Sequence, residues 1–481
     1  MYIRFIKQLA CIVSIPCFFY SCNDYSSSNR LDTYLGGEIV NPNSNFIILS
    51  KDTKPADTIY LDRNNRFLHK FEDFEDGIYS FRHSPENQLV LLEKGDSLYF
   101  RLNTMELDES LAFTGIGAEK NTFLIEMFLL NELERDALIQ RDFKLKPQAF
   151  QSKQNALINR RKKRLNKLNS KVTLSPLAKK ILKASYQYDF YSRFEMYSYS
   201  HYGITDIAKI KELPPSFFDY REKINFNNED LKRLYSYNRF LNHYITNASY
   251  TNYTKGKSYR TDPVGVTMYE LNLVDSLINN SYIKNNLLRG ITSEFLLSNE
   301  DTTASKKVLD HYIDKSSNKT FIDDLTRLRK ATAKLKPNNT IPNQELISSK
   351  GNIIQLSSVF KKPITALFFW SLEDQKHYVS AHQRAHQLTN RYPAIDFIAI
   401  NTDEQQTRNW LQTINRHAYN PAFEYEFKYP KCSSEELVIY DKNKVILVNQ
   451  QGKIINATND LFSHSFEKRL HIYNNSIRTI H

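Results

Sequence analysis

The stretch Ile364–His377, ITALFFWSLEDQKH, decides the fold of the C-terminal third of the chain. Its first seven residues, Ile364–Trp370, are apolar apart from one threonine and rich in aromatic side chains, which predicts a strand buried on both faces of an α/β sheet. Ser371 and Asp374 follow, and a side-chain oxygen there can accept from the free amides at the start of a helix. A buried strand is therefore expected to run straight into a helix N-terminus.

The residues that follow continue this α/β pattern. We expect a helix over 372–391, a strand over 395–401, a helix over 404–417 capped by Thr402, a hairpin of 445–448 and 453–455, and a final helix from Phe462. The first two strands are joined by a helix, so they should be parallel with a right-handed crossover. Asn338–Asn339, with Pro337 and Pro342 around them, predict a linker into this domain.

This order of elements, with Trp370 at the end of the first strand, resembles the thioredoxin domain of envelope thiol-disulfide oxidoreductases of the TlpA/ResA type, and the whole chain resembles their lipoprotein relatives. In that family a Cys-x-x-Cys motif lies at the first helical turn, where the helix dipole lowers a thiol pKa. Counted from Trp370, the two cysteines fall at Asp374 and His377, and the family's cis-proline falls at Asn443 or Lys444. Because dithiol exchange needs an attacking and a resolving thiol, the resemblance implies the fold without disulfide reductase or isomerase activity.

The chain is 481 residues long, which is too long for one core and predicts a multidomain α+β protein. Short strands with turn signals begin at Tyr34, and apolar residues at helical spacing begin after Glu119. The predicted division is a signal peptide at 1–21, a tether at 22–33, a β-sandwich-like domain at 34–115, a helical region at 116–345 and a thioredoxin-like α/β domain at 346–481.

The N-terminus predicts the compartment. Arg4 and Lys7 precede the mainly apolar run Leu9–Tyr20, and a small residue then precedes Cys22. This order is typical of a lipoprotein signal peptide, so we expect acylation of Cys22 and a lipid-anchored location in the cell envelope, on the periplasmic side or at an outer membrane. An uncleaved anchor and ordinary secretion are the alternatives. No later segment reaches about 18 consecutive apolar residues.

The net charge and the cysteine content limit the classes of binding partner and the use of disulfides that we expect. The formal net charge is +12, which favours anionic envelope lipids or polysaccharides. The export signal makes nucleic acid an unexpected partner. Once the leader is removed, Cys432 is the only cysteine besides Cys22, so the mature chain is not expected to rely on disulfides.

Two further pairs of residues are candidate sites. Asp374 and His377 lie at i and i+3 and share a helix face, so an acid–base pair or half of a metal site is an alternative to helix capping. His382 and His386 are at i and i+4, but the sequence offers no identifiable third ligand, and we interpret both as surface histidines. We therefore predict neither a metal nor a cofactor.

The favoured hypothesis is a non-catalytic protein that binds an extended peptide or a partner protein in a groove formed by Trp370, Asp374, Lys444 and Val445. The alternative is a redox enzyme that uses Cys432 as a single thiol with an external thiol as resolver. A third hypothesis is a tethered structural component of the envelope.

Overall fold

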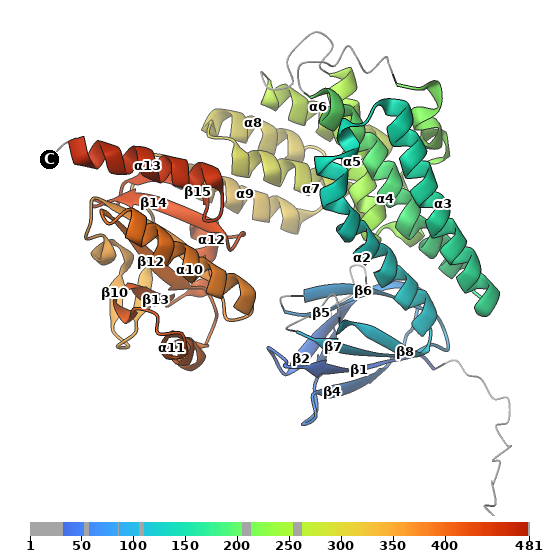
Figure 1. Cartoon of the computed structure of the whole chain (residues 1–481), viewed down its shortest axis with the longest axis horizontal. Coiled ribbons are helices and arrows are strands. Elements are labelled where there is room, and N and C mark those ends of the chain that lie inside the picture. Colours follow the sequence, from blue (N-terminus) through green and yellow to red (C-terminus); the bar gives the residue numbers. More distant parts are fainter. Residues whose placement is uncertain are drawn as a thin grey trace, which may run out of the picture.

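The computed structural model describes residues 32–51, 57–84, 86–104, 110–203, 213–253 and 262–479. These residues form a β-domain, a helical region and a C-terminal α/β domain in chain order (Figure 1). The predicted signal peptide and Cys22 lie outside the described residues. Within the described part, no helix is both long enough and apolar enough to cross a membrane.

The β-domain consists of two four-stranded sheets, ordered β4-β1-β7-β8 and β3-β2-β5-β6. All pairings are antiparallel except β1 with β7. Side chains of both sheets, among them Leu35, Phe81 and Phe100, share one core, which is the arrangement of a sandwich. The strands are β1 Tyr34–Val40, β2 Phe46–Ser50, β3 Asp57–Tyr60, β4 Arg66–Lys70, β5 Gly77–His83, β6 Glu86–Leu92, β7 Ser97–Asn103 and β8 Ala112–Ile116.

The helical region is built around α4, whose aromatic side chains are buried, as helical spacing indicates. Its Glu195 is fully buried and accepts hydrogen bonds from Arg221, Tyr220 and Asn247. The helices are α2 Ala118–Gln140, α3 Pro147–Lys171, α4 Pro176–Tyr202, α5 Tyr235–Asn252, α6 Pro263–Leu277, α7 Ser281–Ser298, α8 Thr302–Ile313 and α9 Lys319–Lys334, with 3-10 turns η1 Asp142–Lys144, η3 Pro215–Lys223 and η4 Glu229–Leu231.

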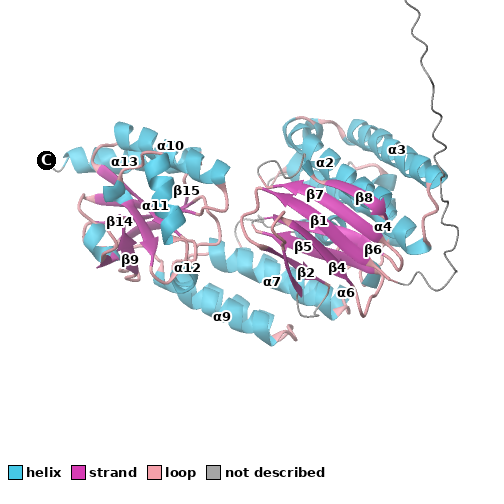
Figure 2. Ribbon diagram, turned by 90° about the horizontal axis from the view of Figure 1, so that it is seen from below, coloured by secondary structure: helices cyan, strands magenta, loops and turns pink. Residues whose placement is uncertain are grey.

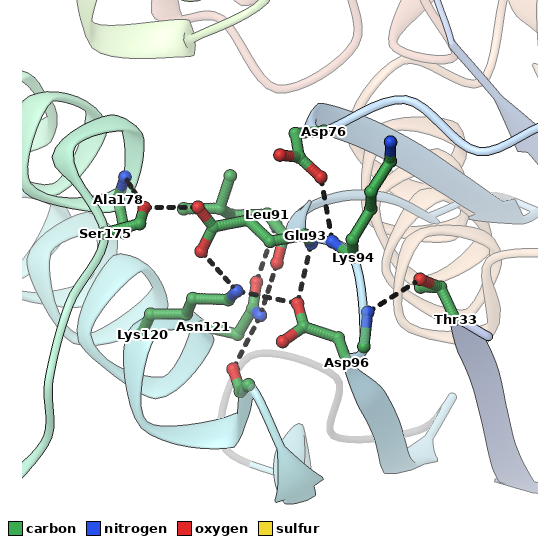
Figure 3. A network of polar contacts seen from close by, with 12 residues as sticks. Thr33, Asp76, Leu91, Glu93, Lys94, Asp96, Lys120, Asn121, Ser175 and Ala178 are labelled. Atoms are coloured by element: carbon green, nitrogen blue, oxygen red, sulfur yellow. Dashed lines mark hydrogen bonds and ion pairs between the residues drawn. The ribbon is translucent and has the colours of Figure 1, made fainter. Parts of the chain in front are cut away.

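A buried polar network joins the β-domain to the helices (Figure 3). The Lys120 ammonium on α2 lies 2.7 Å from Glu93 and 2.6 Å from Asp96, both in the β6–β7 turn. Asn121 bonds the backbone of Leu91 through both its amide oxygen and its amide nitrogen, and Ser175, which caps α4, donates to Glu93. Since the lysine side chain is only 7% exposed, these contacts fix the β-domain against α2 and α4.

The C-terminal domain has one seven-stranded sheet in the order β10-β9-β13-β12-β11-β14-β15. As predicted, β11 and β12 are parallel, and β14 and β15 form an antiparallel hairpin next to β11. The helices α10, α11 and α13 cover one face, where Trp370, Trp410 and Phe466 share a core (Figure 2). This is the thioredoxin-like order of strands and helices.

The bounds of the C-terminal elements are β9 Glu345–Ser348, β10 Ile353–Gln355, η5 Leu356–Val359, β11 Ile364–Trp370, α10 Gln375–Arg391, β12 Ile395–Asn401, α11 Thr407–Arg416, η6 Pro421–Phe423, β13 Glu424–Phe427, α12 Pro430–Glu436, β14 Lys444–Asn449, β15 Ile454–Asp460 and α13 His464–Thr479.

The opposite face of this sheet packs on the helical region. Leu325 and Leu328 of α9 belong to the same buried cluster as Phe369 of β11 and Ile446 of β14. The segment predicted as a linker is part of this junction, because Asn338 N–H donates to Ile454 O and Ile454 N–H donates to Asn339 O. It is therefore ordered by pairing with the hairpin, which the sequence did not indicate.

Three helix starts were predicted too early, and the last helix, expected from Phe462, begins at His464. Asp374 caps α10, which begins at Gln375 and not at Leu372. The cap of α11 is Gln406, so Thr402 does not cap it; the Thr402 hydroxyl instead donates to Trp370 O, which leaves a loop of several residues after β12. This loop lies beside the end of β11 and shapes the candidate site.

Candidate functional site

A cavity of about 700 Å³ opens where β11 and β12 end. Ligands of open α/β sheets commonly bind at the carboxyl ends of such strands, where the loops diverge. The C-terminal domain lines the cavity with Phe369, Trp370, Ser371, Leu372, Glu373, Thr402, Asp403, Glu404, Gln406, Asn409, Ser434, Ile439, Tyr440 and Lys442. No cysteine is among the described residues that line it.

Asp403 fixes the loop that follows β11. Its carboxylate accepts from the Ser371 hydroxyl at 2.5 Å, from the Leu372 amide at 2.7 Å and from the Asn401 side-chain amide at 2.8 Å. The Asp403 amide in turn donates to the Asn401 side chain at 3.0 Å. Three donors on one carboxylate hold residues 371–373 in a single conformation. The sequence signal for Asp403 is a carboxylate two residues beyond a predicted strand.

Of the two positions where the resemblance predicts cysteines, Asp374 stabilises α10 through its side chain and His377 through its backbone amide. Asp374 accepts from the His377 amide at 3.0 Å as the N-cap, and its other oxygen lies 3.6 Å from Lys442 Nζ. Burial lowers the pKa of His377, so its ring is mainly neutral at pH 7. The pair does share a helix face, but neither residue lines the cavity. Their arrangement is that of a helix cap.

The four residues predicted as a groove do not line one cavity, although Trp370 and Val445 belong to the same core cluster. Trp370 lines the cavity but is fully buried, and its ring packs against Tyr378 and His382. Val445 is in the core of the sheet. Lys444 lines a separate cavity of about 640 Å³ facing α7 and α9; its Nζ donates to Val438 O at 2.9 Å, and burial lowers its pKa to about 8.

His382 is buried, so its interpretation as a surface histidine was wrong. Its ring stacks on Tyr419 at a centroid distance of 3.7 Å, and its two nitrogens lie 2.7 Å from Tyr378 O and 3.0 Å from the Glu424 carboxylate. Because a carbonyl only accepts, Nδ1 carries a proton and Nε2 shares one further proton with Glu424. Burial raises the pKa of Glu424, and His382 opposes that rise.

This pair borders a second cavity, of about 710 Å³, which His386 also lines. We asked whether it could be a metal centre. Among the residues that the structure describes, no group of three His, Cys, Asp or Glu side chains is arranged to hold a metal ion.

Cys432 lies on α12 and is exposed. It lines neither the strand-end cavity nor the second cavity, although Ser434, two residues further on, does line the first. The thiol is therefore not among the described residues that line either cavity.

Comparison with known proteins gives structural neighbours only. No family model matches the chain, and no curated protein matches its sequence. A thioredoxin-like protein from Bacteroides caccae is 13% identical, with 58% of this chain and 92% of that chain covered and a TM-score of 0.33. The thioredoxin domain of a thiol-disulfide oxidoreductase from Bacteroides vulgatus is 20% identical, with coverages of 28% and 99% and a TM-score of 0.24.

A third neighbour is the exposed lipoprotein thioredoxin of Streptococcus pneumoniae, 10% identical, with coverages of 27% and 98% and a TM-score of 0.23. The structural neighbours are thus thioredoxin-like thiol-disulfide oxidoreductases, matched at low identity and over part of the chain. The order of strands and helices described above carries the fold assignment.

Proposed function

We propose that this chain is a non-catalytic relative of thiol-disulfide oxidoreductases, which binds an extended segment of a partner polypeptide in the strand-end cavity. The observation that carries this proposal is the loop after β11, which Asp403 holds with three hydrogen bonds while Asp374 caps α10. The place where the family keeps a reactive dithiol is here a fixed, polar rim.

The cavity suits such a ligand in size and lining. Its volume of about 700 Å³ is within the usual range for binding sites and accommodates a few side chains. Tyr440 at its border is 62% exposed, so an aromatic surface is available to a bound segment. Ser434 and Asn409 add polar groups that can pair with a peptide backbone.

Peptide binding by the purified chain, from residue 23 onward, tests the proposal. Pools of fluorescein-labelled heptapeptides of random sequence serve as the probe, and anisotropy is the readout. Asn409→Trp, on the exposed side of α11, should fill the cavity and weaken binding at least about tenfold. Asn415→Trp, exposed on the same helix but outside the cavity, is the matched control and should bind like the parent. Equal binding by both variants would place the peptide elsewhere.

Catalysis is tested separately by thiol-dependent reduction of insulin disulfides. We expect no turnover by the parent chain or by Cys432→Ser, because one thiol cannot both attack and resolve. Turnover in the parent that disappears in Cys432→Ser would overturn the non-catalytic proposal and assign the chemistry to Cys432.

We also propose that the chain is attached to the cell envelope through a lipid on Cys22. The order of charged, apolar and small residues before Cys22 supports this. Expression of the full sequence followed by detergent partitioning should place the parent in the detergent phase and Cys22→Ala in the aqueous phase. A Cys22→Ala variant that partitions like the parent would contradict lipid attachment at this residue.

A further inference from the structure

The strand-end cavity is not formed by the C-terminal domain alone. Pro42 and Asn43, in the turn between β1 and β2, line it together with Trp370 and Asp403. In the turn between β5 and β6, the Ser84 hydroxyl donates to a Glu373 carboxylate oxygen at 2.7 Å, although the two residues are 289 positions apart. In Figure 1 the β-domain and the C-terminal domain face one another, with β2 and β5 on one side and α10 on the other.

The two turns of the β-domain are bound to each other, so they form one wall. The Asn43 amide donates to His83 Nε2 at 3.0 Å, and the Asn43 side chain donates to Ser84 O at 3.2 Å. His83 Nδ1 lies 3.0 Å from Phe46 O, and burial lowers the pKa of His83, which suits a neutral ring that accepts at Nε2 and donates at Nδ1. Asn43 and Ser84 are therefore held in a fixed relation.

This wall is also held in place from behind. The Lys120 network fixes the β-domain to α2 and α4 (Figure 3), and the core shared by α9, β11 and β14 fixes the helices to the C-terminal sheet. Because both junctions are buried, the Ser84–Glu373 contact does not have to position the two domains by itself. The contact joins two walls whose relative position is already fixed by the helical region.

The lining of the cavity is acidic although the protein is basic. Three carboxylates, Glu373, Asp403 and Glu404, face one ammonium, Lys442, among the described residues that line it. Lys442 lies 3.6 Å from the Asp374 carboxylate, which offsets its charge. A chain with a formal charge of +12 thus presents a local negative site, which complements a cationic side chain.

We propose that the β-domain forms one wall of the peptide site, and that a lysine- or arginine-bearing extended segment is held between Asn43, which bonds the Ser84 carbonyl, on one side and Glu373 and Glu404 on the other. This inference rests on the proposed peptide-binding function and adds to it the partner's chemistry and the requirement for both ends of the chain. Glu373, bonded to Ser84, is the residue through which the two walls meet.

The experiment uses the full mature chain and fluorescein-labelled heptapeptide pools with Lys, Gln or Glu fixed at the central position. The Lys pool should bind at least about fivefold more tightly than the Glu pool at low ionic strength, and the difference should shrink as salt is added. Ser84→Arg should weaken binding of the Lys pool about tenfold or more, because the new guanidinium would pair with Glu373 and occupy the wall. Thr114→Arg, on an exposed position of β8, adds the same charge to the same domain and should bind like the parent.

Each result separates the two proposals. If Asn409→Trp loses binding and Ser84→Arg keeps it, the peptide site stands and the β-domain wall is refuted. If the Glu pool binds as tightly as the Lys pool, selection of a basic side chain is refuted. If no pool binds the parent, the peptide-binding function itself fails. Circular dichroism and thermal unfolding of every variant establish that each is folded before its binding is compared.

Discussion

Replacing Asp403 by alanine should destabilise the C-terminal domain and remove peptide binding together. The substitution deletes the acceptor of three hydrogen bonds, from Ser371, Leu372 and Asn401. A hydrogen bond to a charged group contributes about 1.5–3 kcal/mol when it is buried. Asn401 is fully buried, so its side-chain amide would lose its partner without gaining water. Ser371 is only 5% exposed, but it lines the cavity together with Leu372, so water there can replace the lost acceptor.

Counting Asn401 in full and discounting the two loop donors for solvent access gives a loss of about 2–4 kcal/mol in the free energy of unfolding. Asp403→Asn keeps one acceptor oxygen but turns an amide toward one of the donors, so it should cost about half as much. Glu404→Ala, at the exposed neighbouring position, is the matched control for stability and should change it by no more than about 0.5 kcal/mol.

The assay is urea unfolding followed by tryptophan fluorescence. The chain has two tryptophans, Trp370 and Trp410, both fully buried in the core of the C-terminal domain, so the signal reports this domain separately from the rest. Peptide anisotropy is measured on the same preparations below the unfolding transition. An Asp403→Ala variant with the parent's midpoint, or one as stable as Glu404→Ala, would refute the view that Asp403 organises the loop.

Three further outcomes follow from the same structure. Burial raises the pKa of Glu424 above its ordinary value of 4.5, so protonation of this carboxyl stabilises the fold; that stability is fully present below pH 4.5 and is lost as pH rises through the folded-state pKa. The parent should therefore lose stability relative to Glu424→Gln over that window, by at most about 1.4 kcal/mol per pH unit. Parallel profiles of urea midpoint against pH for the two proteins would contradict this prediction. Ala418 is exposed and has φ 52°, so Ala418→Gly should raise stability by about 0.5–1 kcal/mol in the same fluorescence assay, and an unchanged midpoint would count against it. Glu195→Ala should lower the free energy of unfolding by about 3–5 kcal/mol, because it leaves Arg221 beside an empty, buried site. The measurement is unfolding followed by circular dichroism of the helices, and a transition like the parent's would show that this hydrogen-bond network adds no net stability.

The central strands of the C-terminal domain could be predicted because their sequences encode their surroundings locally. β11 and β12 have the bounds that their largely apolar runs indicate, since a strand buried on both faces is mostly apolar. The one charged residue within them, Asp396, pairs with Lys362. β13 could not be found in this way. It contains Glu424 and Glu426, whose burial is tolerated because His382 and Thr407 bond them from other elements. Such partners are not visible within a short window of sequence.

The candidate site likewise contains residues that local sequence indicates and residues that it does not. His382 could have been placed in the core, because Tyr378, Ala381, Ala385 and Leu388 recur around it at helical spacing, yet attention to a chelating pair of histidines concealed that pattern. The wall formed by Asn43 and Ser84 had no such signal. It depends on how three domains pack, and packing over hundreds of residues is set by the Lys120 network and the α9 core rather than by any local motif.

Asp374, where the resemblance predicts a cysteine, links the proposed absence of dithiol chemistry to the proposed binding. The first turn of α10 favours negative charge whatever group carries it, because its free amides and dipole stabilise an anion. In thioredoxin-like enzymes that anion is a thiolate; here it is the Asp374 carboxylate, which accepts the His377 amide and lies near Lys442. Under the non-catalytic proposal, the same electrostatic preference therefore stabilises a helix cap and activates no nucleophile. Instead it draws the one ammonium of the cavity lining toward α10, which leaves Glu373 and Glu404 available to a cationic ligand.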